Sequence, residues 1–355
     1  MNRHVLRRYP NAVTLVILGM LSIVTVLALG RGAVDIPPVA VLDTLAGAVG
    51  LPGTGEYATS LQQSIILSVR LPRVLLGLLA GGILAITGVL MQAFFRNPLA
   101  DPALIGVSAG GALGAVAMIV LGSSLFSGLA ASTSALALPG AAFIGSLTAC
   151  GIVFGLARRE GHVNVTTMLL CGIAVNAMAG AGIGLLSFLA DDAQLRDLTF
   201  WSLGSLGAAS WWQIAAVLPA CLLIIVSAPF LMPTLNALLL GDSEARHLGY
   251  DVERLKLFIL LLTCSGAGAV VATSGVIGFI GLIAPHLSRL LVGPNHRYVI
   301  PISGLFGATL LTLADMIART IVVPAELPIG ILTALIGGPI FLWLLRQTGD
   351  RRLHA

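Results

Sequence analysis

The fold is decided by the stretch "RNPLADPALIGVSAGG", residues 96–111, which leads into 56 consecutive residues without a charged side chain, Pro102 to Ala157. A membrane-spanning helix needs about 20 mostly apolar residues, so this run is long enough for two crossings. Lipid offers no hydrogen bonds to the backbone, and only helices and closed barrels satisfy their own backbone groups. Continuous apolar runs without alternation favour helices.

The composition of the whole chain points the same way. Hydrophobic residues make up 57% of the 355 positions and charged residues 10%, whereas soluble domains contain about 25% charged residues. We therefore expect an all-α polytopic membrane protein. The net charge of +4 does not indicate a nucleic-acid partner, because the arginines are scattered over loops rather than gathered on one face.

About ten transmembrane helices are expected from the charge-free stretches and turn signals, in a single domain over residues 1–355. Short tails, 1–11 and 347–355, would flank the bundle, and residues 31–63, rich in Gly and Pro, would form a long loop. The sequence "TSG" at 273–275 would separate two helices. The expected spans are 12–30, 74–93, 104–121, 136–157, 165–190, 211–231, 257–274, 277–291, 299–317 and 329–346.

Positive charge predicts the orientation of these spans. Cytoplasmic segments of membrane proteins carry an excess of Lys and Arg. If both termini are cytoplasmic, all but five of the 19 Lys and Arg residues fall on the inner side. The five on the outer side are Arg31, Arg70, Arg73, Arg196 and Arg319.

Glycine is abundant, with 42 residues, and recurs at four-residue spacing. Such spacing lets helix backbones approach closely where no hydrophobic effect drives helices together. We expect tight helix packing at these positions, with a moving or pore-lining helix as an additional role. The repeats are Gly77 and Gly81, then Gly106, Gly110 and Gly114, then Gly180 and Gly184.

Two other classes of membrane protein fit the sequence poorly but stay as alternatives. "GVSAG", residues 106–110, matches the pattern of serine hydrolases, but Ser108 falls within an expected helix rather than at a strand-to-helix turn. Cation-coupled transporters carry acidic residues inside the membrane, whereas Asp315 lies toward the outer end of its expected span. Neither an intramembrane hydrolase nor a secondary transporter is favoured.

The chain also lacks the residues expected for nucleotide or metal binding. A phosphate-binding loop ends in Gly-Lys-Ser or Gly-Lys-Thr, but the sole lysine, Lys256, follows Leu255. Any ATP would therefore be bound by another polypeptide. The histidines lack ligand spacing, so no metal site is expected. The cysteines, all within expected spans, are interpreted as packing residues; they are Cys150, Cys171, Cys221 and Cys264.

One long inner segment, "LLLGDSEARHLGYDVERLK" at 238–256, is expected to be structured. Asp242 or Ser243 can cap a short helix, Gly249 can end it, and Asp251 can cap a second. The prediction is a pair of short amphipathic helices within residues 235–256. A solvated connector is the plainer alternative.

Several motifs together resemble the permease family of type II ABC importers, which carry iron siderophores, heme and vitamin B12 through bacterial inner membranes. They extend over most of the chain, in the family's order. The matching stretches are "RLPRVLLGLLAGGILAITGVLMQAFFRNPLADPALIGVSAGG" from 70, "QLRDLTFWSLGSLG" from 194, "LLLGDSEARHLGYDVERLK" from 238, "GVIGFIGLIAPHLSRLLVG" from 275 and "AELPIGILTALIGGPIFLWLL" from 325.

The resemblance implies a type II importer permease fold and a set of partners. In this family two ten-helix subunits form a homodimer in the lipid bilayer, with the pathway at their interface. Two cytoplasmic ATPase subunits use the ATP, and a periplasmic binding protein delivers the substrate. The chain itself would then be no enzyme and would hold no permanent cofactor.

The resemblance also implies roles for residues at the inner side. The helix pair would dock into a groove on the ATPase, through Glu244, Arg246, Leu248 and Gly249. The turn after the second span would help to close the inner end of the pathway through Asn97 and Leu99. The corresponding turn at the start of the fifth span carries Val165 and Thr166. Each turn has a plainer alternative as a simple connection between helices.

On the outer side, Arg70, Arg73 and Arg319 match family positions that meet glutamates of the binding protein. The alternatives are interfacial anchoring for the first two and an i,i+4 pair with Asp315 for Arg319.

The stretch "DDAQLRDLTFWSLGSLG", residues 191–207, looks most like the heme permeases of the family. Arg196 could attract a heme propionate or could pair with a neighbouring aspartate. Heme is therefore the expected cargo, with a ferric siderophore or a corrinoid as the alternative.

Overall fold

The structure is a computed structural model that describes residues 9–51, 57–125, 131–159, 162–322 and 325–353. Its helices are α2 (Pro10–Gly30), α3 (Pro38–Ala48), α4 (Ser60–Ser64), η1 (Ile65–Arg70), α5 (Leu71–Phe94), η2 (Pro102–Ile105), α6 (Val107–Leu125), α7 (Ala131–Ala157), α8 (Val165–Leu189), α9 (Asp192–Ser202), α10 (Trp211–Leu238), α11 (Asp242–His247), α12 (Val252–Ser274), α13 (Ile280–Val292), α14 (His296–Ile321) and α15 (Ile329–Leu353), and its strands are β1 (Arg158–Arg159) and β2 (His162–Val163).

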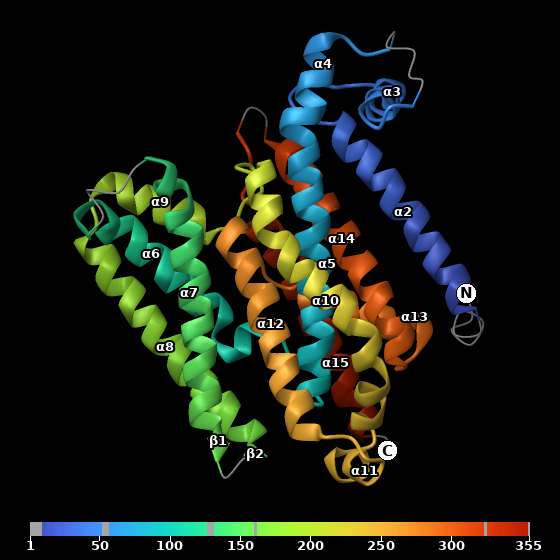
Figure 1. The fold of residues 1–355 in the computed structure, drawn as a ribbon, viewed down its shortest axis with the longest axis vertical. Coiled ribbons are helices and arrows are strands. Elements are labelled where there is room, and N and C mark those ends of the chain that lie inside the picture. Colours follow the sequence, from blue (N-terminus) through green and yellow to red (C-terminus); the bar gives the residue numbers. More distant parts are fainter. Residues whose placement is uncertain (1–8, 52–56, 126–130, 160–161, 323–324, 354–355) are drawn as a thin grey trace.

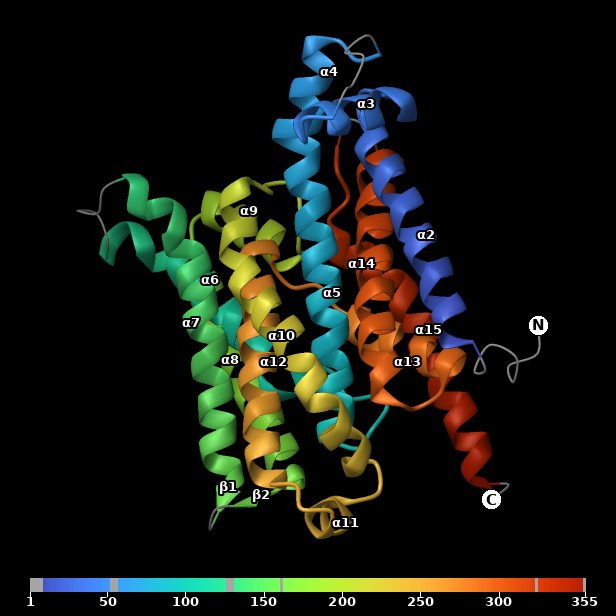
Figure 2. The same cartoon turned by 45° about the vertical axis from the view of Figure 1, so that its right-hand side comes forward.

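The long helices run side by side between two ends of a bundle (Figure 1). We call the end that carries α3, α4 and α9 the upper end, and the end that carries α11 and the antiparallel β1–β2 hairpin the lower end. Helix α5 lies at the centre and contacts α10, α12, α13 and α14. Helices α6, α7 and α8 form a second group beside it, joined to the centre through α12 (Figures 1 and 2).

The expectation of an all-α membrane bundle is confirmed, with a helix at each of the ten expected spans. Seven helices of the described chain are long and apolar enough to cross a membrane, and α6, α13 and α15 contribute shorter apolar helices. The chain is therefore a multi-pass membrane protein.

One expected crossing, 277–291, is wrong in its extent, because α13 has only 13 residues. At 1.5 Å per residue it is about 20 Å long, less than the roughly 30 Å hydrocarbon core. The preceding linker, 275–279, is not helical. Non-helical backbone at membrane depth must be covered by protein, and here Gly275 contacts the carbonyl of Trp201 while Gly204 contacts that of Val276.

The expected long loop at 31–63 is also wrong, because it contains helices at the upper end. Proline at the first position starts α3, where its missing N–H removes no hydrogen bond. Thr59 and Gln62 form a reciprocal capping box that starts α4. Helix α4 then continues through η1 into α5, so the helical stretch around the second span runs from Ser60 to Phe94.

The turn after α5 folds back into the bundle. The Cβ of an alanine at Gly172 would lie 1.9 Å from the carbonyl oxygen of Leu104. Helix η2 therefore packs against α8 at Gly172, beyond the first turn of α8, which begins at Val165. Asp101 caps η2 by accepting from the N–H of Ala103 at 2.9 Å, and its Oδ2 lies beside Gly281 of α13. The structure thus brings this carboxyl between helices.

Close backbone contacts at glycine confirm part of the expected packing. Gly81 of α5 lies against Gly307 of α14, and Gly114 of α6 lies against Ala141 of α7. Gly180 and Gly184 differ, because a Cβ at either position would meet no atom within 4 Å. These two glycines do not serve packing within the described chain.

The cysteines pack as expected, but two of them come together. Cys150 of α7 and Cys264 of α12 are neighbours across the interface between these helices, and both are free and buried. They are 114 positions apart in the chain, so their spacing gave no signal of this contact.

We expect Gly88→Ala to destabilise the bundle, because its Cβ would lie 1.9 Å from the carbonyl oxygen of Gly281. Overpacking of this kind costs about 1–3 kcal/mol. Gly151→Ala is the matched control, since nothing lies within 4 Å of its Cβ and alanine is the better helix former. Thermal unfolding in detergent should show a lower midpoint for the first variant only; equal midpoints would contradict the packing argument.

Candidate functional site

The lower end holds a short helix that is fixed firmly to the bundle. Asp242, the first residue of α11, pairs with Arg96 (Nη2–Oδ1 2.7 Å) and with Lys256 (Nζ–Oδ2 2.7 Å). Arg96 follows α5 and Lys256 lies in the first turns of α12. One carboxylate therefore joins three elements, and sequence reasoning had treated it only as a capping residue.

The expected helix pair is confirmed for its first member and wrong for its second. Asp251 caps the long helix α12, accepting from the N–H of Arg254 at 3.0 Å, so the second short helix is the start of a membrane span. Gly249 lies between them with a φ of +89°, in the left-handed region that glycine adopts without strain. Residues 241–251 thus form a compact projecting turn.

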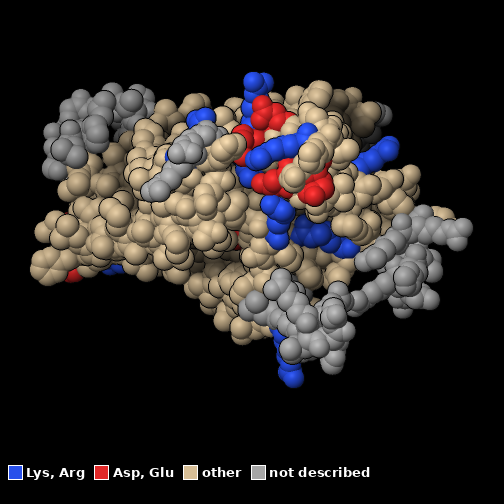
Figure 3. Space-filling view, turned by 90° about the horizontal axis from the view of Figure 1, so that it is seen from below, with Lys and Arg blue, Asp and Glu red and all other residues tan. Residues whose placement is uncertain are grey.

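All four residues expected to contact an ATPase lie exposed on this turn: Glu244, Arg246, Leu248 and Gly249. Leu248 is 60% exposed and lies among the charged side chains of this turn. Arg246 pairs with Glu253 at 3.0 Å. Seen from below, acidic and basic side chains gather in one patch, and only scattered charged side chains lie elsewhere on this face (Figure 3).

The two expected gate turns also lie at the lower end. The Asn97 side chain accepts from the N–H of Leu99 at 3.0 Å and so shapes the turn. Val165 and Thr166 begin α8, which is capped by Asn164. In the described part of the chain no hydrogen bond joins one turn to the other. Asn176, which sequence reasoning did not single out, connects α8 to η2 by donating to the carbonyl of Ala103 at 3.2 Å.

At the upper end, two of the expected docking arginines cap a helix. The last carbonyls of a helix have no partner within it and attract cations. Arg70 donates from Nη1 to the carbonyls of Leu29 (2.8 Å) and Gly30 (2.7 Å) at the end of α2. Arg319 of α14 donates to the neighbouring carbonyl of Ala28. The end of α2 is thereby attached to two other helices.

The third arginine, Arg73, joins α5 to the α14 region. It binds Asp315 through Nε (3.0 Å) and Nη2 (2.9 Å), and Glu326 through Nη1 (2.9 Å). The Asp315 side chain is 3% exposed and that of Glu326 is 47% exposed. Arg319 lies 3.8 Å from Asp315, as the i,i+4 alternative expected, but its Nε has no hydrogen-bond partner among the described residues.

All three arginines are less than a tenth exposed, although the sequence suggested surface positions. Their guanidinium groups are held by carbonyls and carboxylates of this chain, so Glu326 is the accessible part of the cluster. Reversing the charge of all three would remove the cap of α2 and leave buried acids unpaired. Docking of a partner at these arginines stays a prediction.

Arg196 lies exposed on α9 at the upper end. The alternative of pairing with a neighbouring aspartate is not formed, since no ion pair to Arg196 occurs within 4.0 Å among the described residues. Asp191 instead caps α9, accepting from the N–H groups of Ala193 and Gln194. Arg196 is therefore available to a ligand or partner.

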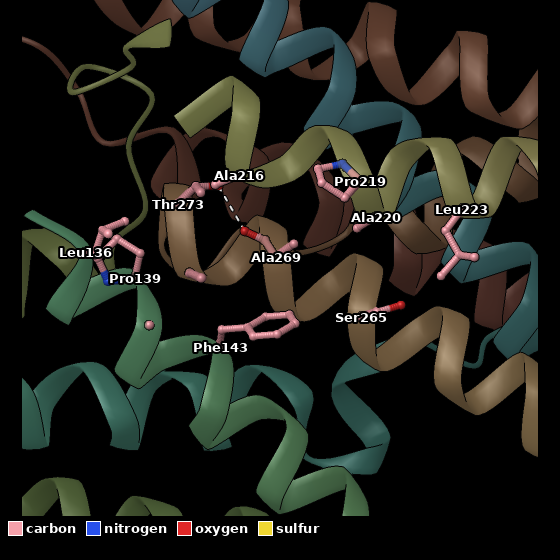
Figure 4. Close-up of a pocket in the computed structure, with 12 residues that line it drawn as sticks. Leu136, Pro139, Phe143, Ala216, Pro219, Ala220, Leu223, Ser265, Ala269 and Thr273 are labelled. Atoms are coloured by element: carbon pink, nitrogen blue, oxygen red, sulfur yellow. Dashed lines mark hydrogen bonds between the residues drawn. The ribbon is translucent and has the colours of Figure 1, made fainter. Parts of the chain in front are cut away.

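Two open grooves on the bundle are almost entirely apolar. One, of about 470 Å³, lies between α7, α10 and α12 (Figure 4). Its hydroxyls are satisfied within α12, where Ser265 donates to Leu261 and Thr273 to Ala269. The other, of about 550 Å³, lies between α6, α7 and α8. Neither groove is lined by an acidic, basic or histidine side chain.

The features that other classes of transporter and hydrolase need are only partly brought together: Asp101 and Ser108 line one small cavity, but no histidine is among its lining residues. Asp315 is committed to Arg73, and Ser108 lies within α6 rather than on an elbow. Within the described residues no three His, Cys, Asp or Glu side chains are grouped to hold a metal.

Comparisons with known proteins agree with this architecture. The FecCD transport family matches residues 20–347. The hemin transport system permease protein of Yersinia pestis is 48% identical over 81% of this chain and 85% of its own. The cobalamin import permease of Halobacterium salinarum is 39% identical over 98% and 92%, and the Fe(3+)-citrate import permease of Bacillus subtilis is 35% identical over 96% of each.

A solved structure agrees as well. It is described as a metal-chelate type ABC transporter in an inward-facing conformation, and it superposes with a TM-score of 0.79 at 32% identity over 95% of this chain and 99% of its own. The bundle is thus the permease fold of type II ABC importers. With matches of this extent in both sequence and structure, the chain belongs to the FecCD transport family.

Proposed function

We propose that this chain is the permease subunit of an ABC importer that carries heme across a bacterial inner membrane. The observation that carries the importer function is the projecting turn 241–251. It is fixed to α5 and α12 through Asp242 and presents an exposed apolar tip. A rigid, projecting contact is what a motor subunit needs to tilt the helices of its partner.

The lower end is the cytoplasmic end in this proposal, with both termini on that side. The positive-inside rule supports this orientation, because Arg96, Arg246, Arg254, Lys256 and Arg297 all belong to the lower end. The upper end then faces the periplasm and the binding protein.

A homodimer is proposed to form the pathway, with this subunit supplying one wall. Helix α8 supports this role because most of its surface is unburied and because Gly180 and Gly184 leave open space. A second backbone or a large apolar cargo could approach closely there. Asn97, Leu99, Val165 and Thr166 at the lower end of this wall are the proposed inner gate.

Coupling to the ATPase is tested by Leu248→Asp. The substitution places a charge on the tip that is proposed to fill a groove of the ATPase subunit. We expect it to weaken binding to the ATPase by about 2 kcal/mol, or roughly thirtyfold in affinity. Because Leu248 is exposed, the bundle itself should keep its stability. We expect binding-protein-stimulated ATPase activity and uptake to fall together in proteoliposomes.

The control for coupling is Arg254→Gln, also at the lower end and 88% exposed. It should leave uptake and stimulated ATPase activity unchanged. Undiminished uptake by Leu248→Asp would refute the docking role of the projecting turn.

Docking of the binding protein is proposed at the upper arginine cluster, Arg70, Arg73 and Arg319, with Glu326 as its accessible rim. Glu326→Gln should speed association, because it removes an acid that competes with the partner's glutamates for Arg73 Nη1. The expected gain is several-fold at low salt and should vanish at high salt.

Asp35→Asn is the matched control for this charge change. Asp35 is an exposed acid of the upper end that pairs with Arg31. Stopped-flow association rates should rise for Glu326→Gln only. An equal rise in both variants would indicate general attraction rather than docking at the cluster.

Heme is favoured as cargo by the 48% identity to a hemin permease against 39% and 35% for cobalamin and ferric citrate permeases. Apolar walls suit a porphyrin, and exposed Arg196 could attract its propionates. A ferric siderophore or a corrinoid is the alternative cargo.

The cargo is tested by uptake into proteoliposomes that contain the permease, its ATPase and its binding protein. We expect heme to be imported at least about tenfold faster than cobalamin or ferric citrate, as differential recognition of this size is common. Arg196→Gln should slow heme import without affecting the other two. Preferred import of cobalamin or ferric citrate would overturn the heme assignment while leaving the importer class intact.

A further inference from the structure

A small cavity with several polar lining residues lies at the lower end, beside the proposed gate turn, whose Pro98 lines it, and beside the base of the projecting turn. Its volume is about 220 Å³. It lies where α5, α10 and α13 end and α14 begins, and its floor includes Gln92 of α5. The polar side chains that line it are Gln92, Arg96, Arg289 and His296.

Arg289 has no partner in the described part of the chain. Its Nη2 is buried without a hydrogen bond, and no ion pair or hydrogen bond to its guanidinium occurs there. The other cation of the cavity, Arg96, is paired with Asp242. Arg289 is partly exposed, but its Nη2 is buried, and charged groups withdrawn from water are normally paired or bound to a ligand, so this end of the guanidinium is suited to an anionic ligand.

The rest of the cavity offers no counter-ion. No carboxylate lines it, and Asp242 already serves both Arg96 and Lys256. His296 is not acidic, and its Nδ1 and N–H both lie at Asn236 Oδ1 (3.0 and 2.9 Å). The cavity therefore has an excess of positive charge.

One further polar group that lines the cavity, the side-chain amide of Gln92, has an atom without a hydrogen-bond partner. Gln92 is 4% exposed and donates from Nε2 to the carbonyl of Gly281 at 3.3 Å, but its Oε1 has no partner. A ligand with acceptor oxygens for Arg289 Nη2 and a hydroxyl that donates to Gln92 Oε1 would provide partners for both side chains. Monoprotonated inorganic phosphate has that combination, and a phospholipid such as phosphatidylglycerol has it when its headgroup glycerol supplies the hydroxyl; arginine binds phosphate strongly.

We propose that this cavity binds a phosphate group through Arg289, with Gln92 and Arg96 beside it. The phosphate could belong to an anionic phospholipid headgroup, which the helix-end position would place at the membrane surface, or to a soluble phosphate. Since Arg96 also holds Asp242 of α11, an occupied cavity would stiffen the base of the projecting turn. The site adjoins the proposed gate turn through Pro98 but includes none of the proposed gate residues.

The test uses the full-length chain, delipidated in detergent and also reconstituted in nanodiscs. In the first arm inorganic phosphate is titrated and followed by calorimetry and thermal unfolding. In the second arm nanodiscs of phosphatidylcholine with and without phosphatidylglycerol are compared, and native mass spectrometry counts the retained lipids. Arg289→Gln is compared with wild type, and Arg254→Gln is the control for surface charge.

We expect wild type and Arg254→Gln to be stabilised by one of the two probes and Arg289→Gln to bind that probe at least about tenfold more weakly. Phosphate binding without lipid retention assigns the site to a soluble ligand, and retained phosphatidylglycerol assigns it to a lipid. Without either probe, Arg289→Gln should unfold at the same or a higher temperature, because it removes an unpaired cation.

The proposal is overturned if neither probe binds, or if Arg289→Gln binds as wild type does. A marked loss of stability of the ligand-free Arg289→Gln would also count against it, because that result assigns Arg289 a structural partner. None of these readouts depends on transport, so they stand apart from the proposed import of heme.

Discussion

Backbone groups inside this bundle need partners within the chain, because lipid supplies none, and this constraint accounts for features at both the upper and the lower end. A long helix satisfies its own backbone, but its ends and breaks do not. At the upper end the last carbonyls of α2 are satisfied by Arg70 and Arg319. An unpaired buried backbone group costs about as much as a lost hydrogen bond, so these two cations fix where α2 can end.

The same constraint governs the places where the chain leaves the helical conformation. The linker before α13 and the turn through η2 both run between helices rather than along a surface. Each is enclosed by a backbone that approaches closely at glycine, at Gly275 and Gly172 in particular. Small residues therefore do more here than tighten the bundle. They let irregular backbone be covered by protein, which permits a half-length helix and a folded-back turn in the interior of a transporter.

Sequence reasoning predicted a helix at each of the ten expected spans, but it did not predict these breaks or the short helices α3, α4 and α9. Uncharged runs of about 20 residues mark crossings through composition alone, and Gly275 marked the end of α12 through its turn chemistry. The position of Asp101 beside Gly281, the approach of Gly88 to Gly281 and the contact of Leu104 with Gly172 join residues that are distant in the chain and carry no local signal. The resemblance to a family motif singled out Leu248 as a contact residue. The ion pairs of Asp242 with Arg96 and Lys256 are visible only in the structure, because these residues are well separated in the chain.

Arginine shows most clearly why residue type alone does not define a site. Arg70, Arg73 and Arg319 fell on the outer side of the expected topology and suggested a docking surface, yet they are buried, and carbonyls and carboxylates of the same chain accept hydrogen bonds from all three. Arg289 gave no signal in the sequence, and its Nη2 is buried without a partner. A buried cation whose donors are satisfied stabilises the fold, while one left unsatisfied reduces stability until a ligand binds. Accounting for each donor therefore separates arginines that hold helices together from an arginine that is suited to bind an anion.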